Sequence, residues 1–337
     1  MNRILVVRLG SLGDVVHAMP AVAALGRQWP AAAIDWVTAP TYQGLAGMLH
    51  GLRRVVGVDT RRLTGPTGLI AAVRTLRAAR YDLVLDLQGL LKSAVLARLA
   101  GGRRTLGYAP PDLREPAAAV CYSERVDVSG ATHIIDKGLA LAGAAGCADV
   151  TRAFALTVPA VPEVDALAAR LPSGYALLNP GAAWPNKRWP ADRFGAVASW
   201  LRRERGLASV VLWGPGEQGG AEAVVTASGG SAELAPSLTI PGIAALARAA
   251  RLVVSGDTGP LHLAAAVGTP AVALFGPTRA ERNGPWAVED VSISRLDRCE
   301  CHYERRCRRA DPCINTIDTD EVVAAVRLRL DRAERRR

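Results

Sequence analysis

A strand, a glycine-rich turn, a helix and a second strand follow one another near the C-terminal end of this chain. The apolar run Leu252–Val254 predicts a buried strand, and it ends at the turn Ser255–Gly259. A helical pattern over Pro260–Val267 then leads into a second apolar run, Ala271–Phe275. This is the βαβ order of a parallel sheet, so the chain is constrained to an α/β fold.

The turn of this unit is a candidate anion site. It places backbone N–H groups and a helix N-terminus at the carboxyl edge of the sheet, where ligands of open α/β sheets bind. Asp257, Thr258 and His262 add three polar side chains to the turn and to the first helical turn. We therefore favour a phosphate-bearing ligand here over a purely structural turn.

A turn of the same kind opens the chain. The strand Ile4–Val7 is followed by the glycine turn Arg8–Asp14 and by a helix over Val15–Gln28. The turn lacks the third glycine of a dinucleotide-binding fingerprint. Asp14, at the start of the helix, has two interpretations. It can cap the helix and favour its dipole, or it can be an exposed carboxylate that acts as a base.

Length and composition limit the class of protein. With 337 residues, of which 50% are hydrophobic, the chain can bury a large core, and about 150 residues per domain predicts two domains. Residues 1–3 lead directly into a strand, so we expect no signal peptide. No uncharged apolar run approaches the ~20 residues of a membrane span. We therefore expect a cytoplasmic protein.

The chain is strongly basic, with a net charge of +10 and a sequence pI of about 9.8. This charge favours an acidic partner, which could be nucleic acid, an anionic membrane face or a phosphorylated substrate. The arginine-rich composition could also reflect only a GC-rich genome. Aromatic residues make up only 5% of the chain. The sequence shows no aromatic-rich basic stripe that would stack bases, so we expect no nucleic-acid partner.

Lysine is rare in this arginine-rich chain, and it occurs only at Lys92, Lys137 and Lys187. A lysine retained in such a chain can mark a need for a compact ammonium group. Lys187 lies in a Pro- and Trp-rich loop, residues 179–190, after a predicted strand. Lys92 follows the turn Asp86–Gly89, again after a predicted strand. We interpret Lys137 as a solvated surface residue.

Strands and helices alternate along both halves of the chain. The expected strands are Ile4–Val7, Ile34–Val37, Arg54–Val58, Leu83–Leu87, Thr105–Gly107, Ala176–Leu178, Val210–Trp213, Leu252–Val254, Ala271–Phe275 and Val291–Ile293. The expected helices are Val15–Gln28, Tyr42–Leu49, Gly68–Ala79, Leu91–Ala100, Thr132–Ala145, Asp192–Arg205, Gly219–Ala227, Ile243–Ala249 and Leu261–Val267. The proline-rich segment Thr157–Pro162 is interpreted as a linker. We predict Rossmann-like domains at 1–158 and 159–318, facing a central cleft, and a basic amphipathic helix at 319–337.

Four of the six cysteines cluster at Cys299, Cys301, Cys307 and Cys313. Their spacing is more compressed than the paired C-x2-4-C knuckles of a typical zinc site. Structural disulfides are disfavoured by the expected cytoplasmic location. We expect no metal and interpret the cluster as reduced thiols, with a metal site as the alternative. The neighbouring arginines would favour thiolates, and hence sensitivity to oxidation.

Four motifs, in order, resemble those of the ADP-heptose:lipopolysaccharide heptosyltransferases, glycosyltransferase family 9. They are Arg8–Pro20, Tyr81–Ala94, the loop Pro180–Pro190, and Gly256–His262 with Leu274–Pro277. The cysteine-rich segment resembles one found in many members. The resemblance is collinear from residue 1 to about residue 320. It implies the GT-B fold, with two Rossmann-like domains, a central cleft and a C-terminal helix that crosses back toward the first domain.

The resemblance also implies a chemistry. Family members transfer L-glycero-D-manno-heptose from ADP-heptose to the inner core of lipopolysaccharide, with inversion and without a metal or other cofactor. By motif position, Asp14 is the general base and Lys187 stabilises the departing ADP. The implied donor-binding residues are Glu217, Asp257, Thr258, Gly259, Pro260, His262, Ala182 and Ala183. The implied acceptor-binding residues are Arg8, Gly10, Ser11, Gly13, Gln88, Lys92, Arg61 and Arg62.

Two motifs point to different acceptors. The alanines at 182 and 183 stand where enzymes that add the first heptose often carry hydroxyl groups, so this loop resembles the second-heptose enzymes. The segment Asp86–Ser93 resembles the first-heptose enzymes, and we favour that type, with Kdo–lipid A as acceptor. We expect a monomer at the cytoplasmic face of the inner membrane. The alternatives are another sugar-nucleotide transferase or epimerase of this fold, and a non-enzymatic basic or metal-binding module.

Overall fold

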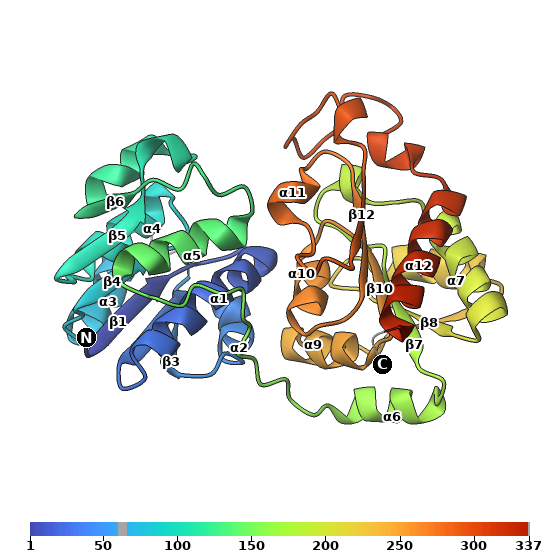
Figure 1. Ribbon diagram of the computed structural model, residues 1–337, viewed down its shortest axis with the longest axis horizontal. Helices are drawn as coiled ribbons and strands as arrows, with labels where there is room; N and C mark the ends of the chain where they lie inside the picture. Colours follow the sequence, from blue (N-terminus) through green and yellow to red (C-terminus); the bar gives the residue numbers. More distant parts are fainter. Residues whose placement is uncertain (60–65, 336–337) are drawn as a thin grey trace. The chain divides into compact units, whose positions relative to one another are not determined.

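The computed structural model describes residues 1–59 and 66–335. The chain forms two compact units, Met1–Thr157 and Val158–Arg337, and each has its own six-stranded parallel sheet with helices packed on it (Figure 1). The division lies one residue from the boundary expected at 158. The two parallel α/β sheets confirm the predicted fold class. The cleft between the two domains stays a prediction.

The first unit has the strand order β3-β2-β1-β4-β5-β6. Its strands are β1 (Arg3–Val7), β2 (Ala33–Thr38), β3 (Leu52–Gly57), β4 (Leu83–Asp86), β5 (Arg104–Tyr108) and β6 (Glu124–Val126). Its helices are α1 (Leu12–Gln28), α2 (Gln43–Ala46), α3 (Pro66–Arg77), α4 (Leu91–Leu99) and α5 (Ile134–Ala145), with short 3-10 segments that include η1 (Pro40–Tyr42) and η4 (Pro116–Cys121). Since β1 lies between two other strands, its residues Ile4–Val7 are fully buried, as the apolar run predicts.

The second unit repeats this topology with the strand order β12-β11-β10-β7-β8-β9. Its strands are β7 (Tyr175–Asn179), β8 (Ala208–Val211), β9 (Ala232–Leu234), β10 (Leu252–Gly256), β11 (Ala271–Phe275) and β12 (Val291–Ser294). Its helices are α6 (Pro162–Arg170), α7 (Ala191–Arg205), α8 (Gln218–Ala227), α9 (Ile240–Ala249), α10 (Gly259–Ala266), α11 (Ala280–Asn283) and α12 (Thr319–Glu334).

Both sheets have the strand order of a doubly wound fold, in which the direction of the crossovers reverses at one point in the sheet. That point lies between β1 and β4 in the first unit and between β7 and β10 in the second. Ligands of such sheets bind beyond the carboxyl ends of the strands at this point. The loops that follow β1, β4, β7 and β10 are therefore where a site is expected in each unit.

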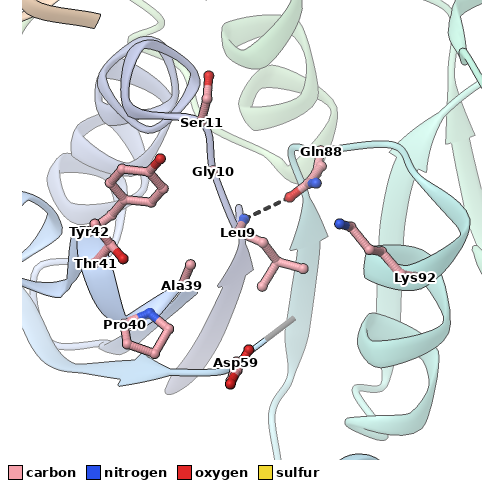
Figure 2. Close-up of a pocket in the computed structure, with 10 residues that line it drawn as sticks. All are labelled: Leu9, Gly10, Ser11, Ala39, Pro40, Thr41, Tyr42, Asp59, Gln88 and Lys92. Carbon is pink, nitrogen blue, oxygen red and sulfur yellow. Dashed lines mark hydrogen bonds between the residues drawn. The ribbon is translucent and has the colours of Figure 1, made fainter. Parts of the chain in front are cut away.

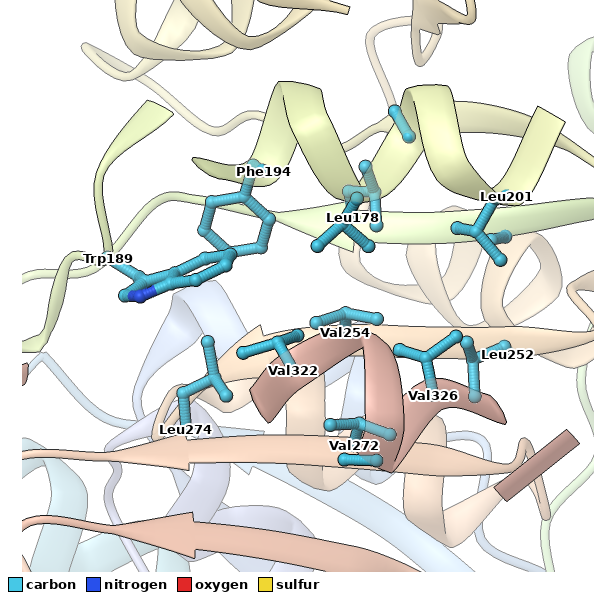
Figure 3. Close-up of a cluster of buried hydrophobic side chains, with 14 of the residues drawn as sticks. Leu178, Trp189, Phe194, Leu201, Leu252, Val254, Val272, Leu274, Val322 and Val326 are labelled. Atoms are coloured by element: carbon cyan, nitrogen blue, oxygen red, sulfur yellow. The ribbon is translucent and has the colours of Figure 1, made fainter. Parts of the chain in front are cut away.

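Helix α12 completes the hydrophobic core of the second unit. Val322, Val326 and Leu330 are buried in one cluster with side chains of β10, β11 and α7, including Phe194 (Figure 3). Arg329 also forms a buried ion pair of 2.7 Å with Asp290. The predicted tail helix therefore belongs, by its packing, to the second unit. Its crossing toward the first domain stays a prediction.

The structure differs from the expected elements at β6 and β9, at α6, at α11, which was not expected, and over residues 42–49. Strands β6 and β9 were not expected, because each has only three residues and carries a charged side chain. Helix α6 begins at Pro162, the last residue of the expected linker, since proline is well tolerated in the first helical turn. The helix expected over Tyr42–Leu49 is one 3-10 turn and one short α-turn that ends before Gly47.

Among the helices of the described residues, none combines the length and the apolar character that crossing a lipid bilayer requires.

Candidate active site

Asp14 lies in the first turn of α1, the helix that follows β1. Its carboxylate accepts hydrogen bonds from the backbone N–H of Ser11 at 2.9 Å and from the Ser11 hydroxyl at 3.0 Å. It thus satisfies a donor at the helix start, as the capping interpretation predicts. The side chain is nevertheless 39% exposed. The carboxylate therefore caps the helix and is also accessible to a substrate.

Arg8 forms an ion pair with the Asp14 carboxylate. Its guanidinium nitrogen lies 2.5 Å from Asp14 Oδ1, and the arginine side chain is only 9% exposed. A second guanidinium nitrogen donates to the carbonyl of Leu87, in the loop after β4. Burial raises the pKa of Asp14, but the Arg8 charge and the Ser11 bonds more than offset it and leave this pKa below its ordinary value. Asp14 is therefore an ionised carboxylate at neutral pH.

A pocket of about 620 Å³ opens at the carboxyl edge of the first sheet (Figure 2), and its lining includes Ser11, whose hydroxyl contacts Asp14. It is lined by Leu9, Gly10, Ser11, Ala39, Pro40, Thr41, Tyr42, Asp59, Gln88 and Lys92. Four of the predicted acceptor residues, Gly10, Ser11, Gln88 and Lys92, therefore line one pocket. Of the others, Arg8 and Gly13 are buried beside it, and Arg61 and Arg62 lie outside the described residues.

Sequence reasoning missed Thr41, Tyr42 and Asp59 as pocket residues. The Tyr42 ring packs on Gly10, where an added Cβ would lie 2.7 Å from ring atom Cε2. Gly10 also has a φ of +152°, which side chains rarely adopt, so the position needs glycine. These residues follow β2, the neighbour of β1, and β3, the next strand along the sheet. The sequence signal that could have identified them is their position directly after predicted parallel strands, whose carboxyl ends share one edge of the sheet.

In the second unit, Lys187 and Asp257 form an ion pair. Lys187 comes from the loop after β7 and Asp257 from the turn after β10, and the nitrogen and carboxylate oxygen are 2.5 Å apart. Lys187 also lies over the Trp184 ring, 4.6 Å from its centre. The loop predicted to carry a functional lysine therefore brings it to the glycine turn predicted to bind an anion.

Two further side chains contact the Asp257 carboxylate. His262 Nε2 lies 3.2 Å from Oδ1, and the Thr278 hydroxyl donates to Oδ2 at 2.6 Å. Asp257 is buried, and burial raises its pKa. The His262 hydrogen bond and the Lys187 charge outweigh that effect and hold the pKa well below its usual range. The site therefore contains a permanent carboxylate next to a cation, at the first turn of α10.

Thr258 is the N-cap residue of α10, and its hydroxyl is fixed by the end of β7. Asn179 Nδ2 donates to the hydroxyls of both Ser255 and Thr258, at 2.9 Å each. Gly259 and Pro260 form the first positions of the helix. The positive end of the α10 dipole thus lies at the carboxyl edge of the sheet, where it favours a phosphate group.

Glu217 lies against the loop that carries Ala182 and Ala183. It is the N-cap residue of α8, and its Oε2 accepts from Gly214 N at 3.2 Å. A Cβ added at Gly181 would lie 2.3 Å from the same oxygen. Ala182 is buried and its carbonyl accepts from Arg188, whereas Ala183 is exposed. The structure thus brings Glu217 next to the predicted diphosphate loop.

The cysteine-rich segment forms a small buried cluster with free thiols. Cys299 and Cys301 have their sulfur atoms 3.6 Å apart, and Cys313 is buried with them. Within residues 1–59 and 66–335, no group of three or more His, Cys, Asp or Glu side chains is arranged to hold a metal ion. Burial raises the pKa of Cys299, Cys307 and Cys313. The expectation that nearby arginines favour thiolates is therefore wrong for these three, because burial dominates.

Two doubly wound units with charged loops at their carboxyl edges define an α/β enzyme of the GT-B type. Residues 69–311 match the description "Glycosyltransferase family 9 (heptosyltransferase)", and the chain belongs to this family. It is therefore a glycosyltransferase. The family match confirms the resemblance seen in the four sequence motifs.

Individual relatives agree with this assignment. The chain is 30% identical to lipopolysaccharide heptosyltransferase 1 of Pseudomonas aeruginosa, over 90% of this chain and 87% of that protein. It is 29% identical to the Escherichia coli protein of the same name, over 82% and 88%. The solved structure of E. coli heptosyltransferase WaaC with ADP shares the fold, with a TM-score of 0.77, 24% identity and coverage of 96% of this chain and 99% of that one.

Proposed function

We propose that this enzyme transfers L-glycero-D-manno-heptose from ADP-heptose to Kdo–lipid A, adding the first heptose of the lipopolysaccharide inner core. The observation that carries the proposal is the cluster of Lys187, Asp257 and His262 at the N-terminus of α10. It combines a cation and a helix dipole for a diphosphate with a carboxylate for sugar hydroxyls. Relatives named lipopolysaccharide heptosyltransferase 1, and a related structure with ADP-2-deoxy-2-fluoro heptose, support this donor and acceptor class.

The proposed reaction is a single displacement with inversion. Asp14 takes the proton from the acceptor hydroxyl, whose oxygen forms a bond to the anomeric carbon of heptose. The bond from that carbon to the diphosphate oxygen breaks, and ADP leaves with the electron pair. An ionised Asp14, held by Arg8 at 2.5 Å, is in the correct protonation state for this role.

We propose that no metal or other cofactor is needed. Negative charge develops on the departing ADP, and the chain itself supplies groups that favour it. These are the Lys187 ammonium and the backbone N–H groups of Thr258 and Gly259, which are fixed donors at the place where charge develops. Glu217 is proposed to hold the ribose, since it lies beside Gly181 in the loop after β7.

The pocket lined by Ser11, Gln88 and Lys92 is proposed as the acceptor site. The proposal is supported by the polar character of these side chains and by the contact of the Ser11 hydroxyl with the proposed base. An ammonium group suits the carboxylates and phosphates of Kdo–lipid A. The loop with Ala182 and Ala183 resembles that of the second-heptose enzymes. The acceptor is therefore tested by comparing transfer to Kdo–lipid A with transfer to Kdo–lipid A that already carries the first heptose.

We further propose that the enzyme acts as a monomer on the cytoplasmic face of the inner membrane, and that α4 contacts the lipid. Leu91 and Leu99 on this helix are 45% and 37% exposed, and Val120 on the adjoining η4 is 75% exposed. Two cations of α4, Lys92 and Arg98, are exposed among them. This mixture of apolar and basic groups suits an anionic bilayer, and Lys92 connects it with the acceptor pocket.

Vesicle sedimentation tests the membrane surface. Leu99→Glu is expected to weaken binding to anionic vesicles about tenfold, since it removes an apolar contact and adds a repelled charge. Val288→Glu is the matched control, because Val288 is 91% exposed in the second unit. Equal loss in both variants, or equal binding to zwitterionic vesicles, would contradict this surface.

The donor is tested by calorimetric titration with ADP, UDP and the 2-fluoro analogue of ADP-heptose. Binding of ADP and the analogue but not UDP, weakened in Lys187→Ala, is the expected result. Preference for UDP would indicate another sugar-nucleotide transferase or epimerase. Absence of nucleotide binding would contradict the proposed site.

A further inference from the structure

Asp86 is a fully buried carboxylate at the end of β4. Its Oδ1 accepts from the backbone N–H groups of Gln88 at 2.9 Å and Gly89 at 3.3 Å. Its Oδ2 accepts from the hydroxyls of Ser93 and Tyr122, both at 2.8 Å. One buried side chain thus joins the loop after β4 to the first turn of α4 and to Tyr122.

The loop that Asp86 fixes contacts the base-bearing loop at two points. The side-chain oxygen of Gln88 accepts from the backbone N–H of Leu9 at 2.7 Å. The carbonyl of Leu87 accepts from the Arg8 guanidinium, whose other nitrogen pairs with Asp14. Hydrogen bonds and the intervening backbone therefore connect Asp86, through the loop after β4, to Arg8 and the proposed base.

The loop has little freedom to adopt another conformation. Gly89 has a φ of +70°, and a Cβ there would lie 2.7 Å from Leu113 Cδ2. The backbone is therefore packed closely against neighbouring side chains on its outer side. The Asp86 carboxylate supplies the hydrogen bonds on its inner side.

We propose that Asp86 is a positioning residue for glycosyl transfer, which holds the loop after β4 so that the Arg8 guanidinium stays on the Asp14 carboxylate. Asp86 does not line the pocket, and it acts on the reaction through Arg8. The inference rests on the proposed function in one respect, namely that Asp14 is the base.

Two variants at Asp86 and one at Leu25 separate this role from a general loss of packing. Asp86→Ala leaves the two N–H groups and the Tyr122 hydroxyl without their acceptor, whereas the Ser93 hydroxyl keeps the Leu90 carbonyl at 2.8 Å. Asp86→Asn keeps one oxygen for the N–H groups, and its amide can donate to the two hydroxyls, which can also accept. Leu25→Ala is the packing control, since Leu25 is fully buried at the far end of α1 from Asp14.

The first measurement is the pKa of Asp14, from the chemical shift of its carboxyl carbon in the full-length protein. In Asp86→Ala we expect this pKa to rise, because burial persists while the Arg8 charge is less well placed. The acid limb of the kcat profile should move to higher pH in the same direction. At neutral pH kcat should fall on the order of 10²-fold, as for a misplaced catalytic group, with the donor KM within about threefold.

Asp86→Asn is expected to keep most of the kcat that Asp86→Ala loses. Leu25→Ala is expected to leave the pKa of Asp14 unchanged, even where it lowers the free energy of unfolding. If Asp86→Ala does not fold, the double variant Ser93→Ala with Tyr122→Phe serves instead, because it leaves the carboxylate only its two backbone bonds. It should raise the Asp14 pKa in the same direction.

An unchanged Asp14 pKa in the folded Asp86→Ala or double variant would overturn the positioning role. The same holds for a shift of equal size in Leu25→Ala. Retained transfer in Asp14→Ala would instead overturn the proposed base. These failures are distinguishable because the carboxyl titration does not depend on activity.

Discussion

The ammonium nitrogen of Lys187 lies 2.5 Å from a carboxylate oxygen of Asp257, and the two side chains are 13% and 3% exposed. The two residues come from different loops, 70 positions apart, that meet at the carboxyl edge of the second sheet. The lysine is thus paired with an internal anion of the protein. Its removal has consequences both for ligand binding and for folding.

Lys187→Ala is expected to weaken binding of ADP and to lower kcat on the order of 10²-fold. The reason is that it removes a fixed donor to the negative charge that develops in the transition state. It should also lower the free energy of unfolding by about 3 kcal/mol, because Asp257 loses its cation while buried. Calorimetry, steady-state kinetics and urea unfolding measure these effects. Lys137→Ala is the control. The interpretation of Lys137 as a solvated surface residue is wrong, since its side chain is 24% exposed and pairs at 2.9 Å with Asp112 in the first unit. An equal loss of ADP affinity there would contradict a specific role.

The stability difference between the wild type and Lys187→Ala should depend on pH. Because the folded-state pKa of Asp257 is depressed, its contribution is fully present above the unfolded value of about 4 and is lost as pH falls through the folded value. In Lys187→Ala the folded-state pKa of Asp257 is higher, so ionised Asp257 contributes less to the free energy of unfolding. The difference should therefore be largest above about pH 5 and narrow below about pH 4. Urea unfolding across this range tests it, and a constant difference would count against the ion pair as its source.

Asp14→Ala should lower kcat by about 10³-fold or more, since general bases contribute on the order of 10²–10⁴. Donor affinity should stay within a few-fold, because the base acts on the acceptor hydroxyl in the transition state. Ser11→Ala is a graded control: it removes the 3.0 Å hydroxyl contact to Asp14 and leaves the backbone one. Turnover in a pure Asp14→Ala sample would remove Asp14 as the base.

Gly181→Ala should weaken ADP binding while changing stability little. The new Cβ would lie 2.3 Å from the Glu217 carboxylate, the far end of a flexible side chain, which must move away. Gly219→Ala is the matched control on α8, because nothing lies within 4 Å of a Cβ there. It should leave ADP affinity unchanged and favour the helix by about 0.5–1 kcal/mol. Equal ADP affinity in all three proteins would contradict a nucleotide contact at Glu217.

Dialysis against a chelator should leave kcat unchanged, because the proposed charge stabilisation comes from Lys187 and the α10 N-terminus. The measurement is the transfer rate before and after EDTA treatment, with metal analysis of the same samples. A loss of rate that a single added metal restores would contradict metal-independent transfer.

The order of elements and the two charged turns were predictable from the sequence, because hydrophobic periodicity locates parallel strands and their loops share one edge. Lys187 and Asp257 are such loop residues, and Asp14 lies in the helical turn directly after such a loop. Tyr42 and Asp59 were missed because their place in the pocket depends on strand order, which periodicity does not determine. Asp86 was interpreted only as part of a motif. Its burial, like that of the cysteine thiols, follows from tertiary packing that the sequence pattern does not contain.

Helix α12 follows in the chain every strand of the sheet that it covers, yet Val322, Val326 and Leu330 are part of the core beneath it. During synthesis, the apolar side chains of the second sheet that α12 covers therefore stay exposed until these residues leave the ribosome. The first unit is completed earlier, since its sheet and its last helix, α5, both come from the chain before Thr157. The nascent chain thus forms the pocket of the first unit first, and the loops of the second unit gain a complete core last.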